Sequence, residues 1–563
     1  MRFHHLKNNL SLVLILVAFI VLIGPFALNF HLRYPDEMYY TNAAVKMVQT
    51  GDFQTTFLGD GNLRFKKPIL TYWFVLVPFK LFGVSPLTSR LFFLLAGAIS
   101  IALSYWAAML FFKKKNIAIL TACILSSLPI WILSSSRSIP DIVLGLFMTL
   151  SSVGFIGFLK YGNSTPTKYH WMLYSGSALA FAAKGLPAVA LCFIGILYLL
   201  ANPWQRIDFR RLIHFPSIIF SIVISCYWYL VMYNAYGAEF INAFFEDQVG
   251  ARVTYNPSLI LKNLLKGIIS AILIFVPWIL FGFFGRKKFL LGLKVHEKAF
   301  IGFVVAWGCC LIILSAFVVK FYSRYFIPVI PITSILLAWW LIKQDFLANS
   351  RRLQIGIDIL LVVNFVILLV GMYLNFQLPS NPWIWVQLFS AIGGMVLIWL
   401  ISRSVAEKLP LLFSLSIFLA VFLTSTVTYH LSLPDAGKSI KTFLKENKVP
   451  KKSDIAYLGN LHIGSKIRIG IGADYFMTDL QEVNTQDIQA NFDYVILEDD
   501  FLEKFQNKHF SIRLAAVNWN PKYFKEMFVS LWYGNQKETK WSFGKKFYWA
   551  VPLKGQGNQK QKR

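Results

Sequence analysis

The sequence predicts a polytopic α-helical membrane protein that ends in a soluble α/β domain. Of its 563 residues, 56% are hydrophobic and 15% charged, with a mean hydropathy of +0.56. Soluble proteins carry about 25% charged residues. Apolar runs of roughly 20 residues, the length that crosses a bilayer as a helix, recur as far as residue 430. The region that follows, residues 432–563, is polar and rich in lysine.

Thirteen apolar runs are expected to span the membrane as helices. They lie near residues 11–30, 86–112, 116–134, 141–159, 170–183, 186–201, 214–233, 262–284, 298–319, 325–342, 355–376, 383–402 and 409–430. The first run resembles a signal peptide in position. It is long, no small-x-small cleavage site follows it, and further spans come after it, so we interpret it as a retained helix.

The net charge of +28 is explained by topology rather than by nucleic-acid binding. Much of it lies in alternate loops, which all fall on one side of a thirteen-span protein. These loops contain Arg2 and Lys7, then Lys113 to Lys115, then Arg206, Arg210 and Arg211, then Arg286, Lys287, Lys288, Lys294 and Lys298, then Arg351 and Arg352. The positive-inside rule makes that side cytoplasmic, and the opposite loops face outward.

The first outward loop, residues 31–85, is the longest between spans. It is expected to contain a short amphipathic helix near 42–48 and an interfacial helix near 69–82, which is aromatic and broken by Pro78. The chain therefore divides into a membrane domain, residues 1–431, and an α/β domain, residues 432–563, with a helix at 439–447 and strands at 454–458, 494–497 and 540–552. An odd number of spans puts this second domain outside the cytoplasm.

Three carboxylates near the outward ends of spans are candidates for catalysis. Asp36 and Glu37 stand side by side before a predicted helix, and Asp141 follows Pro140 at the start of the fourth span. Each aspartate could instead cap its helix. Two adjacent carboxylates so close to lipid are expensive unless they meet a substrate or a cation, so we favour a carboxylate that orients or deprotonates an acceptor.

Basic side chains gather at the same outward helix ends. The main candidates are Lys67, Lys184 and Arg324, with Arg64 as a weaker member. Snorkelling and stabilisation of a helix C-terminus are the alternatives for any one of them. Several cations on one side suit a phosphate at the membrane surface. Candidate pocket residues are Tyr40, Tyr325, Trp73 and Gln248; the aromatic ones could also belong to an interfacial belt.

Together these features indicate group transfer from a lipid phosphate. The lipid tail would lie among the spans, the phosphate would meet lysine and arginine, and the carboxylates would face the transferred group. No P-loop, Rossmann glycine pattern or Cys/His metal spacing occurs in the sequence. The residues therefore call for no cofactor, predict no metal site and leave a divalent-metal requirement open.

The first loop and several later segments resemble those of a known family. The matching pieces are Asp36-Glu37, Phe65-x-Lys67-Pro68 with Tyr72-Trp73, Phe79 to Val84 with Arg90-Leu91, Asp141, Ala183-Lys184-Gly185-x-Pro187, Phe244-Phe245-x-Asp247-Gln248 and Arg324-Tyr325-x-x-Pro328-x-x-Pro331. They resemble the membrane glycosyltransferases of the dolichyl-phosphate-mannose–protein mannosyltransferase type, which have the GT-C fold, and especially the bacterial 4-amino-4-deoxy-L-arabinose transferases of lipid A. The pieces cover residues 1–345 in the expected order.

The resemblance implies an inverting transfer of a sugar from polyprenyl (undecaprenyl) phosphate to lipid A or another envelope acceptor on the periplasmic face of the bacterial inner membrane. Asp36 takes the place of the family's catalytic carboxylate and Asp141 that of its second acid. Lys67, Lys184 and Arg324 match positions that hold the donor phosphate. Membrane lipids, the lipid-linked donor and a glycolipid or protein acceptor are then the expected partners, and we expect a monomer.

Three departures bear on the substrate. The arabinose transferases have an acid where this chain has Lys66, an arginine where it has Tyr39, and a histidine where it has Gln248. A metal site built on that acid and histidine is not expected here, and the sugar and acceptor stay open. Protein O-mannosyl transfer is the alternative within the class. A lipid or glycan transporter is the alternative of another class, and an envelope scaffold without activity is a third.

Overall fold

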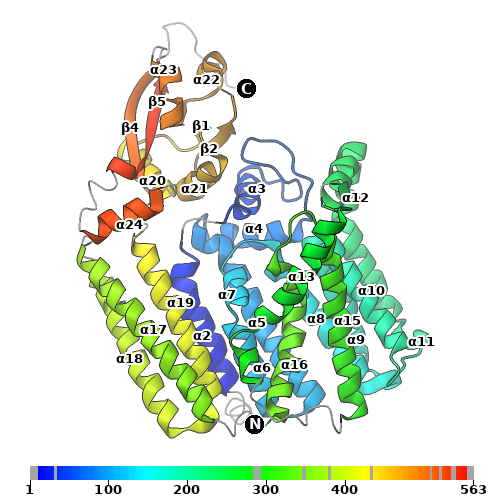
Figure 1. Ribbon diagram of the computed structural model, residues 1–563. Helices are drawn as coiled ribbons and strands as arrows, with labels where there is room; N and C mark the ends of the chain where they lie inside the picture. The colour runs from blue at the N-terminus through cyan, green and yellow to red at the C-terminus, as the bar shows by residue number, and fades with distance from the viewer. Residues whose placement is uncertain are drawn as a thin grey trace.

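The computed structural model describes most of the chain. The described residues are 10–30, 34–250, 252–282, 293–344, 350–377, 382–431, 435–482, 484–506, 510–518, 523–533 and 541–553. They form a large helical part and a smaller part built on a sheet, which stands over one end of the helices (Figure 1). The predicted fold class is therefore confirmed. The exact domain boundary stays a prediction, because residues 432–434 lie outside the described residues.

The helical part contains long apolar helices and two shorter ones in the first outward loop. The helices are α2 (Leu10–Ala27), α3 (Glu37–Thr50), α4 (Leu70–Phe82), α5 (Pro86–Phe112), α6 (Lys115–Ser127), α7 (Pro129–Ser135), α8 (Pro140–Tyr161), α9 (Thr167–Lys184), α10 (Leu186–Ala201), α11 (Phe209–Leu212), α12 (Phe215–Phe245), α13 (Pro257–Leu273), α14 (Trp278–Gly282), α15 (Val295–Ala316), α16 (Ile330–Lys343), α17 (Ser350–Gln377), α18 (Pro382–Ser404) and α19 (Leu409–Leu431). A short π-helix, η2 (Glu246–Gly250), follows α12, and a 3-10 helix, η3 (Ser323–Val329), precedes α16.

Each of the thirteen predicted spans overlaps one of these helices or a pair of them. By length and hydropathy, eight described helices could cross a membrane, or nine if α6 and α7, which meet at 66°, count as one span. The others are shorter, broken or less apolar; the run predicted at 262–284, for example, is divided between α13 and α14. The chain is thus a multi-pass membrane protein, and the count of thirteen stays a prediction.

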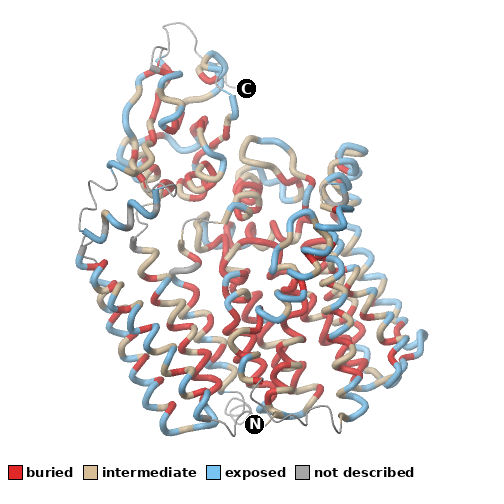
Figure 2. Tube along the Cα trace, viewed as in Figure 1, coloured by how far each residue is buried: buried red, intermediate tan, exposed pale blue. Residues whose placement is uncertain are grey.

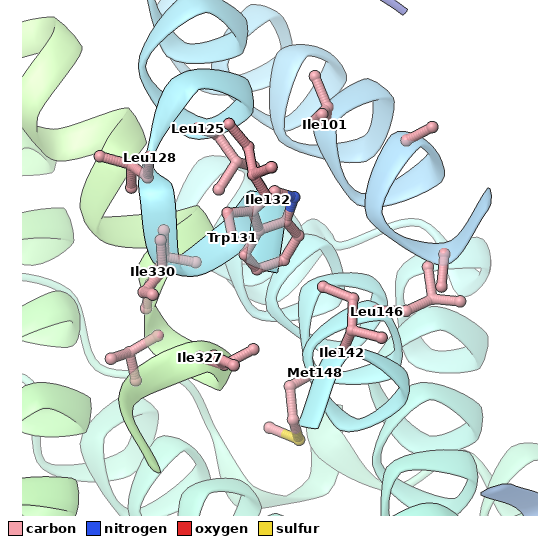
Figure 3. Packing of buried hydrophobic residues seen from close by; sticks show 14 of the residues in the cluster. Ile101, Leu125, Leu128, Trp131, Ile132, Ile142, Leu146, Met148, Ile327 and Ile330 are labelled. Atoms are coloured by element: carbon pink, nitrogen blue, oxygen red, sulfur yellow. The ribbon is translucent and has the colours of Figure 1, made fainter. Parts of the chain in front are cut away.

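The core of the helical part lies around α5, α6, α8 and η3. The apolar stretch of α8 is 89% buried, whereas that of α12 is 17% buried, so α8 is central and α12 faces outward to lipid (Figure 2). Trp131, Ile142 and Ile327 pack together at the centre (Figure 3). A Cβ on Gly145 would lie 2.8 Å from the Ile327 side chain, so α8 and η3 touch closely. This contact fixes the beginnings of two elements that carry site residues.

The first outward loop folds back over the helix ends. The predicted helix near 42–48 is α3, and the predicted interfacial helix is α4, which is too short to be a span. Between them, the chain is attached to α12: the Trp228 indole donates to the carbonyl of Gln54, whose amide donates to the Tyr227 hydroxyl at 2.8 Å. Phe65 is buried against Tyr236 and Phe240 of the same helix. The loop is therefore held in place and not merely tethered at its ends.

The C-terminal part is a five-stranded sheet with helices on it. Its elements are α20 (Ala436–Glu446), β1 (Asp454–Leu458), α21 (Leu461–Ile471), β2 (Phe476–Leu480), α22 (Thr485–Asn491), β3 (Tyr494–Glu498), α23 (Glu503–Gln506), β4 (Phe510–Asn518), α24 (Phe524–Trp532) and β5 (Lys545–Pro552). The strand order is β2-β1-β3-β5-β4; β1 is parallel to β2 and β3, and β5 is antiparallel to its neighbours. Alternate residues face opposite sides: Ile455 and Tyr457 belong to one apolar cluster, Ala456 and Leu458 to the other.

The sheet domain is joined to the first outward loop by buried polar contacts. The Arg468 guanidinium of α21 donates to the Asn42 side chain at 2.8 Å, to the carbonyl of Gly59 at 3.1 Å and to Asp479 at 2.7 Å. A Cβ on Gly59 would collide with the Asp479 carboxylate, so only glycine permits this approach. Helix α3 is therefore braced from the side of the sheet domain.

Candidate active site

The candidate site forms where four element ends meet, on the side of the helices that is predicted to face outward. Asp36 lies at the N-cap position of α3, Asp141 in the first turn of α8, Lys184 in the last turn of α9 and Arg324 near the start of η3. Pro140 at the first position of α8 begins that helix. Residues separated by almost 300 positions thus come together because their elements end at the same level.

The four side chains form a chain of alternating charges. Arg324 Nη2 donates to Asp36 Oδ2 at 2.9 Å, Arg324 Nε lies 3.8 Å from Asp141 Oδ2, and Lys184 Nζ donates to Asp141 Oδ1 at 2.6 Å. The Asp36 side chain is 42% exposed, whereas that of Asp141 is 4% exposed. Asp36 is therefore the carboxylate that an incoming molecule can reach.

Neither aspartate uses its side chain to cap a helix, although capping was an open alternative. Asp36 makes no side-chain cap hydrogen bond, and the residue at the N-cap position of α8 is Ile139. Asp141 still lies in a first helical turn, where negative charge is favourable, and Lys184 in a last turn, where positive charge is. These helix-end effects add to the ion pairs and leave Asp36 available for chemistry.

Arg324 contains an unused donor. Its Nη1 atom is buried and has no hydrogen-bond partner in the described part of the chain. The guanidinium also lies over two aromatic rings, 5.0 Å from the centroid of Tyr34 and 4.4 Å from that of Tyr322. Stacking fixes the plane of the fork, so the unpaired N–H group is presented to an acceptor in a defined direction.

Glu37 differs from the expectation of a catalytic carboxylate. Its two oxygens each accept a hydrogen bond at 2.7 Å from Arg90, and Oε1 also accepts from the Ser138 N–H at 3.0 Å. Both side chains of the pair are almost fully buried. Arg90 Nη1 in addition donates to the carbonyls of Leu28 and Phe30. This is a closed structural pair that joins α3, α5 and the α7–α8 connection, and we reassign Glu37 to positioning.

A second group surrounds Arg64. Its Nε donates to the Tyr72 hydroxyl at 3.2 Å, and its guanidinium lies 3.7 Å from the centroid of the Tyr39 ring. Tyr40 is buried with its ring 4.9 Å from that of Tyr72. Burial raises the pKa of Tyr40 well above its ordinary value, with Tyr72 adding to the effect, so its phenol stays protonated.

Lys67 lies in the same electrostatic neighbourhood. It is 6% exposed, and burial lowers its pKa well below the ordinary value, with the charges of Arg252 and Lys184 acting in the same direction and Asp247 opposing them. Asp247 itself pairs with Arg252 at 2.9 Å and with Lys66 at 3.8 Å. Cations thus outnumber carboxylates here, and an anion would relieve their mutual repulsion.

The pKa of Asp36 is raised above its ordinary value. Burial is the main cause, and the nearby charge of Asp141 adds to it, while Arg64, Lys184 and Arg252 oppose it. A carboxylate with a raised pKa accepts a proton more readily than one in water. This property suits a general base.

The remaining predicted pocket residues are Trp73, Tyr325 and Gln248. The Trp73 indole donates to the Phe53 carbonyl at 2.7 Å and so holds the first loop. Tyr325 lies beneath Lys184, with the ammonium 5.4 Å from its ring centroid. The Gln248 backbone belongs to η2, but its side chain lies outside the described residues. The described residues contain no group of three or more His, Cys, Asp or Glu side chains placed to hold a metal ion.

Two residues were missed as participants from the sequence. Arg90 lies inside a predicted span, where an arginine is expensive without a partner, and this signal could have predicted its pairing with an acid. Arg252 follows Asp247 by five residues in the loop between the seventh and eighth predicted spans, and nothing in its local sequence indicates that it reaches the neighbourhood of Lys67. Long-range folding of that loop places it there.

Known proteins support this interpretation in sequence and in fold. Residues 9–239 match the family model of dolichyl-phosphate-mannose-protein mannosyltransferases. An ArnT structure from Cupriavidus metallidurans in the apo state superimposes with a TM-score of 0.69 over 96% of this chain and 98% of that one, at 17% identity. This chain has the GT-C fold. A second ArnT structure from the same organism, bound to undecaprenyl phosphate, gives the same TM-score at 18% identity.

Two curated relatives extend the likeness. An undecaprenyl phosphate-alpha-4-amino-4-deoxy-L-arabinose arabinosyl transferase from Yersinia pestis is 26% identical over 235 residues, 41% of this chain and 42% of that protein. An uncharacterized protein of Aquifex aeolicus is 27% identical over 325 residues, 57% of this chain and 60% of that protein. The matches thus span less than two thirds of either relative. The resemblance to membrane glycosyltransferases that use lipid-phosphate sugars, drawn from the first outward loop, is confirmed.

Proposed function

We propose that this chain is an inverting glycosyltransferase that moves a sugar from a polyprenyl phosphate to an acceptor at the outer face of a bacterial inner membrane. The acceptor is lipid A or another envelope molecule, and the sheet domain lies in the periplasm. The observation that carries the proposal is the unpaired Arg324 Nη1, beside the reachable carboxylate of Asp36 and within a neighbourhood rich in cations. A donor phosphate would accept the hydrogen bond of Arg324 Nη1, while a reacting hydroxyl would meet the carboxylate of Asp36.

The cationic side of the site fits the donor phosphate. The Arg324 N–H group supplies a directed hydrogen bond, while Lys184 and Lys67 supply charge. Burial and neighbouring cations lower the pKa of Lys67, and the negative charge of the donor phosphodiester would raise it again and favour the ammonium form. The ArnT structure bound to undecaprenyl phosphate and the family match support the same donor class. The polyprenyl tail would lie along the apolar helices.

The proposed reaction is a single displacement at the anomeric carbon. The acceptor oxygen attacks that carbon while the bond to the phosphate oxygen breaks, and its electron pair leaves with the polyprenyl phosphate. Asp36 takes the proton when the acceptor is a hydroxyl. The cations stabilise the negative charge that develops on the leaving phosphate, and the positive charge on the sugar ring in the transition state is favoured near the carboxylates.

The acceptor decides how much Asp36 contributes. A phosphate acceptor is already anionic, so Asp36 would only orient it, whereas a serine, threonine or sugar hydroxyl needs the base. A lipid A phosphate is the acceptor that the resemblance to the arabinose transferases of lipid A favours, and an arabinosyl transferase is among the relatives of this chain. A protein hydroxyl is the second candidate, because the matching family model describes protein mannosyltransferases.

The test is transfer of label from polyprenyl-phosphate sugars to lipid A or to a serine- and threonine-containing peptide. Purified wild type, Asp36→Asn and a matched control, Glu239→Gln, which removes an exposed carboxylate of α12, would be compared. Transfer by wild type and control to one acceptor, with loss in Asp36→Asn, supports the proposal. Folded wild type that releases no sugar from any donor, yet moves the lipid between leaflets, contradicts it in favour of a transporter.

A further inference from the structure

A second basic site lies where the sheet domain meets the ends of the helices. A cavity of about 270 Å³ lies between α20 and α21 on one side and the residues after α2 and at the start of α5 on the other. Helices α20 and α21 belong to the sheet domain that stands over the helix ends in Figure 1. Its lining includes Lys438, Lys441, Lys466, Asp435, Asn29 and Ser85. The cavity shares no lining residue with the candidate active site.

Positively charged side chains outnumber negatively charged ones in the lining of this cavity. Three ammonium groups from two helices face one carboxylate, that of Asp435, and the Asp435 side chain is already used to cap α20 by accepting the Lys438 N–H at 2.9 Å. The three ammonium groups line one cavity and repel one another, and an anion held between them would offset that repulsion.

The cavity is also partly prearranged. Lys438 Nζ donates to the Tyr429 hydroxyl at 2.9 Å, and the Asn29 amide donates to the same hydroxyl at 3.2 Å. Tyr429 is near the end of α19, so the lysine is aimed by a residue of the helical part. Ser85 caps the beginning of α5 by accepting the Thr88 N–H. The ends of α5 and α19 and the residues after α2 thus place the cavity at the depth of lipid headgroups.

We propose that this cavity binds a phosphate anion, supplied by the headgroup of a membrane lipid. Lysine ammonium groups suit phosphate oxygens, and basic pockets beside membrane helices bind anionic headgroups. Leu81 and Phe82, each 64% exposed, are separated from the cavity residue Val84 by Gly83 alone and offer apolar surface to an acyl chain. The site is independent of the proposed glycosyl transfer.

The test uses the full chain in detergent. Native mass spectrometry would measure binding of phosphatidylglycerol and of phosphatidylcholine, and thermal unfolding would be followed with inorganic phosphate alone. The variants are a triple Lys→Gln change at Lys438, Lys441 and Lys466, a triple Lys→Arg change at the same positions, and a control triple Lys→Gln change at the exposed Lys445, Lys451 and Lys504. The arginine variant retains the charge and shows whether substitution itself disturbs folding.

Wild type, the arginine variant and the control are expected to prefer phosphatidylglycerol. The glutamine variant should bind it roughly a hundredfold more weakly, since each lysine near an anionic surface contributes roughly fivefold. Stabilisation by inorganic phosphate that is lost in the same variant, without any preference between the two lipids, assigns the anion site to soluble phosphate and overturns the lipid source. Equal binding by the glutamine variant and the control overturns the site altogether.

Discussion

Two adjacent carboxylates of the first outward loop have opposite environments. Asp36 is partly exposed, faces one N–H group of Arg324 and lies among cations that exceed the local acids. Glu37 is buried, accepts a bidentate pair of hydrogen bonds from Arg90 and another from Ser138. The Asp36 cluster leaves the Arg324 Nη1 donor unsatisfied, whereas hydrogen bonds engage both oxygens of Glu37.

The difference shows that, of two adjacent carboxylates, one can be available for reaction while the other holds the surrounding elements in place. Successive residues at the start of a helix point about 100° apart, so Asp36 and Glu37 face different neighbours. A buried pair with full hydrogen bonding holds its elements in one arrangement, and breaking it is strongly destabilising. A carboxylate that must react cannot be satisfied in this way. We infer that Glu37 and Arg90 hold α3 so that Asp36 is presented correctly.

The largest expected effect is on turnover by Asp36→Asn. With a hydroxyl acceptor, loss of the general base should lower kcat by about 10²- to 10⁴-fold, while the protein keeps its fold. Initial rates of sugar transfer, normalised to folded protein, measure this. A matched Glu239→Gln variant should keep wild-type rates. A loss equally large in both would show that the effect is not specific to the Asp36 cluster.

The next effect is on stability and concerns Glu37. Glu37→Gln leaves Arg90 buried without its counter-charge and should lower the free energy of unfolding by about 3–5 kcal/mol. Thermal or denaturant unfolding in detergent measures it. The double change Glu37→Leu with Arg90→Met removes both charges and should be milder. If Glu37→Gln were as stable as wild type but inactive, Glu37 would be a reacting group and the proposed division would be wrong.

A smaller effect is expected for Arg324→Lys. Lysine retains the charge but loses the planar fork and the stacking on Tyr34 and Tyr322, so the KM for the lipid donor should rise roughly tenfold with a smaller change in kcat. Steady-state kinetics at varied donor concentration separate the two constants. Arg352→Lys, at an exposed position near the opposite ends of the helices, serves as the control. An unchanged KM would remove Arg324 from donor binding.

The smallest effect is the pH dependence. Because the pKa of Asp36 is raised, activity with a hydroxyl acceptor should fall on acidification at a pH above the ordinary aspartate value of 3.8.

The stability of the fold should change with pH in the opposite direction, because the folded state holds the Asp36 proton more tightly than the unfolded state does. The contribution of Asp36 to stability is thus present below the ordinary pKa and is lost as pH rises through the raised one. At neutral pH, Asp36→Asn should therefore unfold at the same temperature as wild type or a slightly higher one, in contrast to Glu37→Gln.

Much of the fold follows from the sequence alone. The apolar runs, the interfacial helix at α4 and the change of composition near residue 431 require no tertiary information, because helix formation in lipid is forced by unsatisfied backbone groups. The continuous apolar run Ile455-Ala456-Tyr457-Leu458 likewise predicts a buried strand. Strands β2 and β4 were missed: apolar and polar residues do not alternate in the short segment 476–480, and the alternation of residues 510–514 stops at Ala515 and Ala516, where the pairing with β5 shifts register.

For the site, the sequence determined which residue types gather at the outward helix ends and that they suit a lipid phosphate. Only the tertiary structure decided which of Asp36 and Glu37 is available, because Arg90 lies 53 positions away from Glu37 and Arg324 lies 288 positions away from Asp36. Pairing of charges across the chain depends on where elements end in space and on which side chain is excluded from solvent. The local sequence reveals neither where the elements end in space nor which side chain is buried.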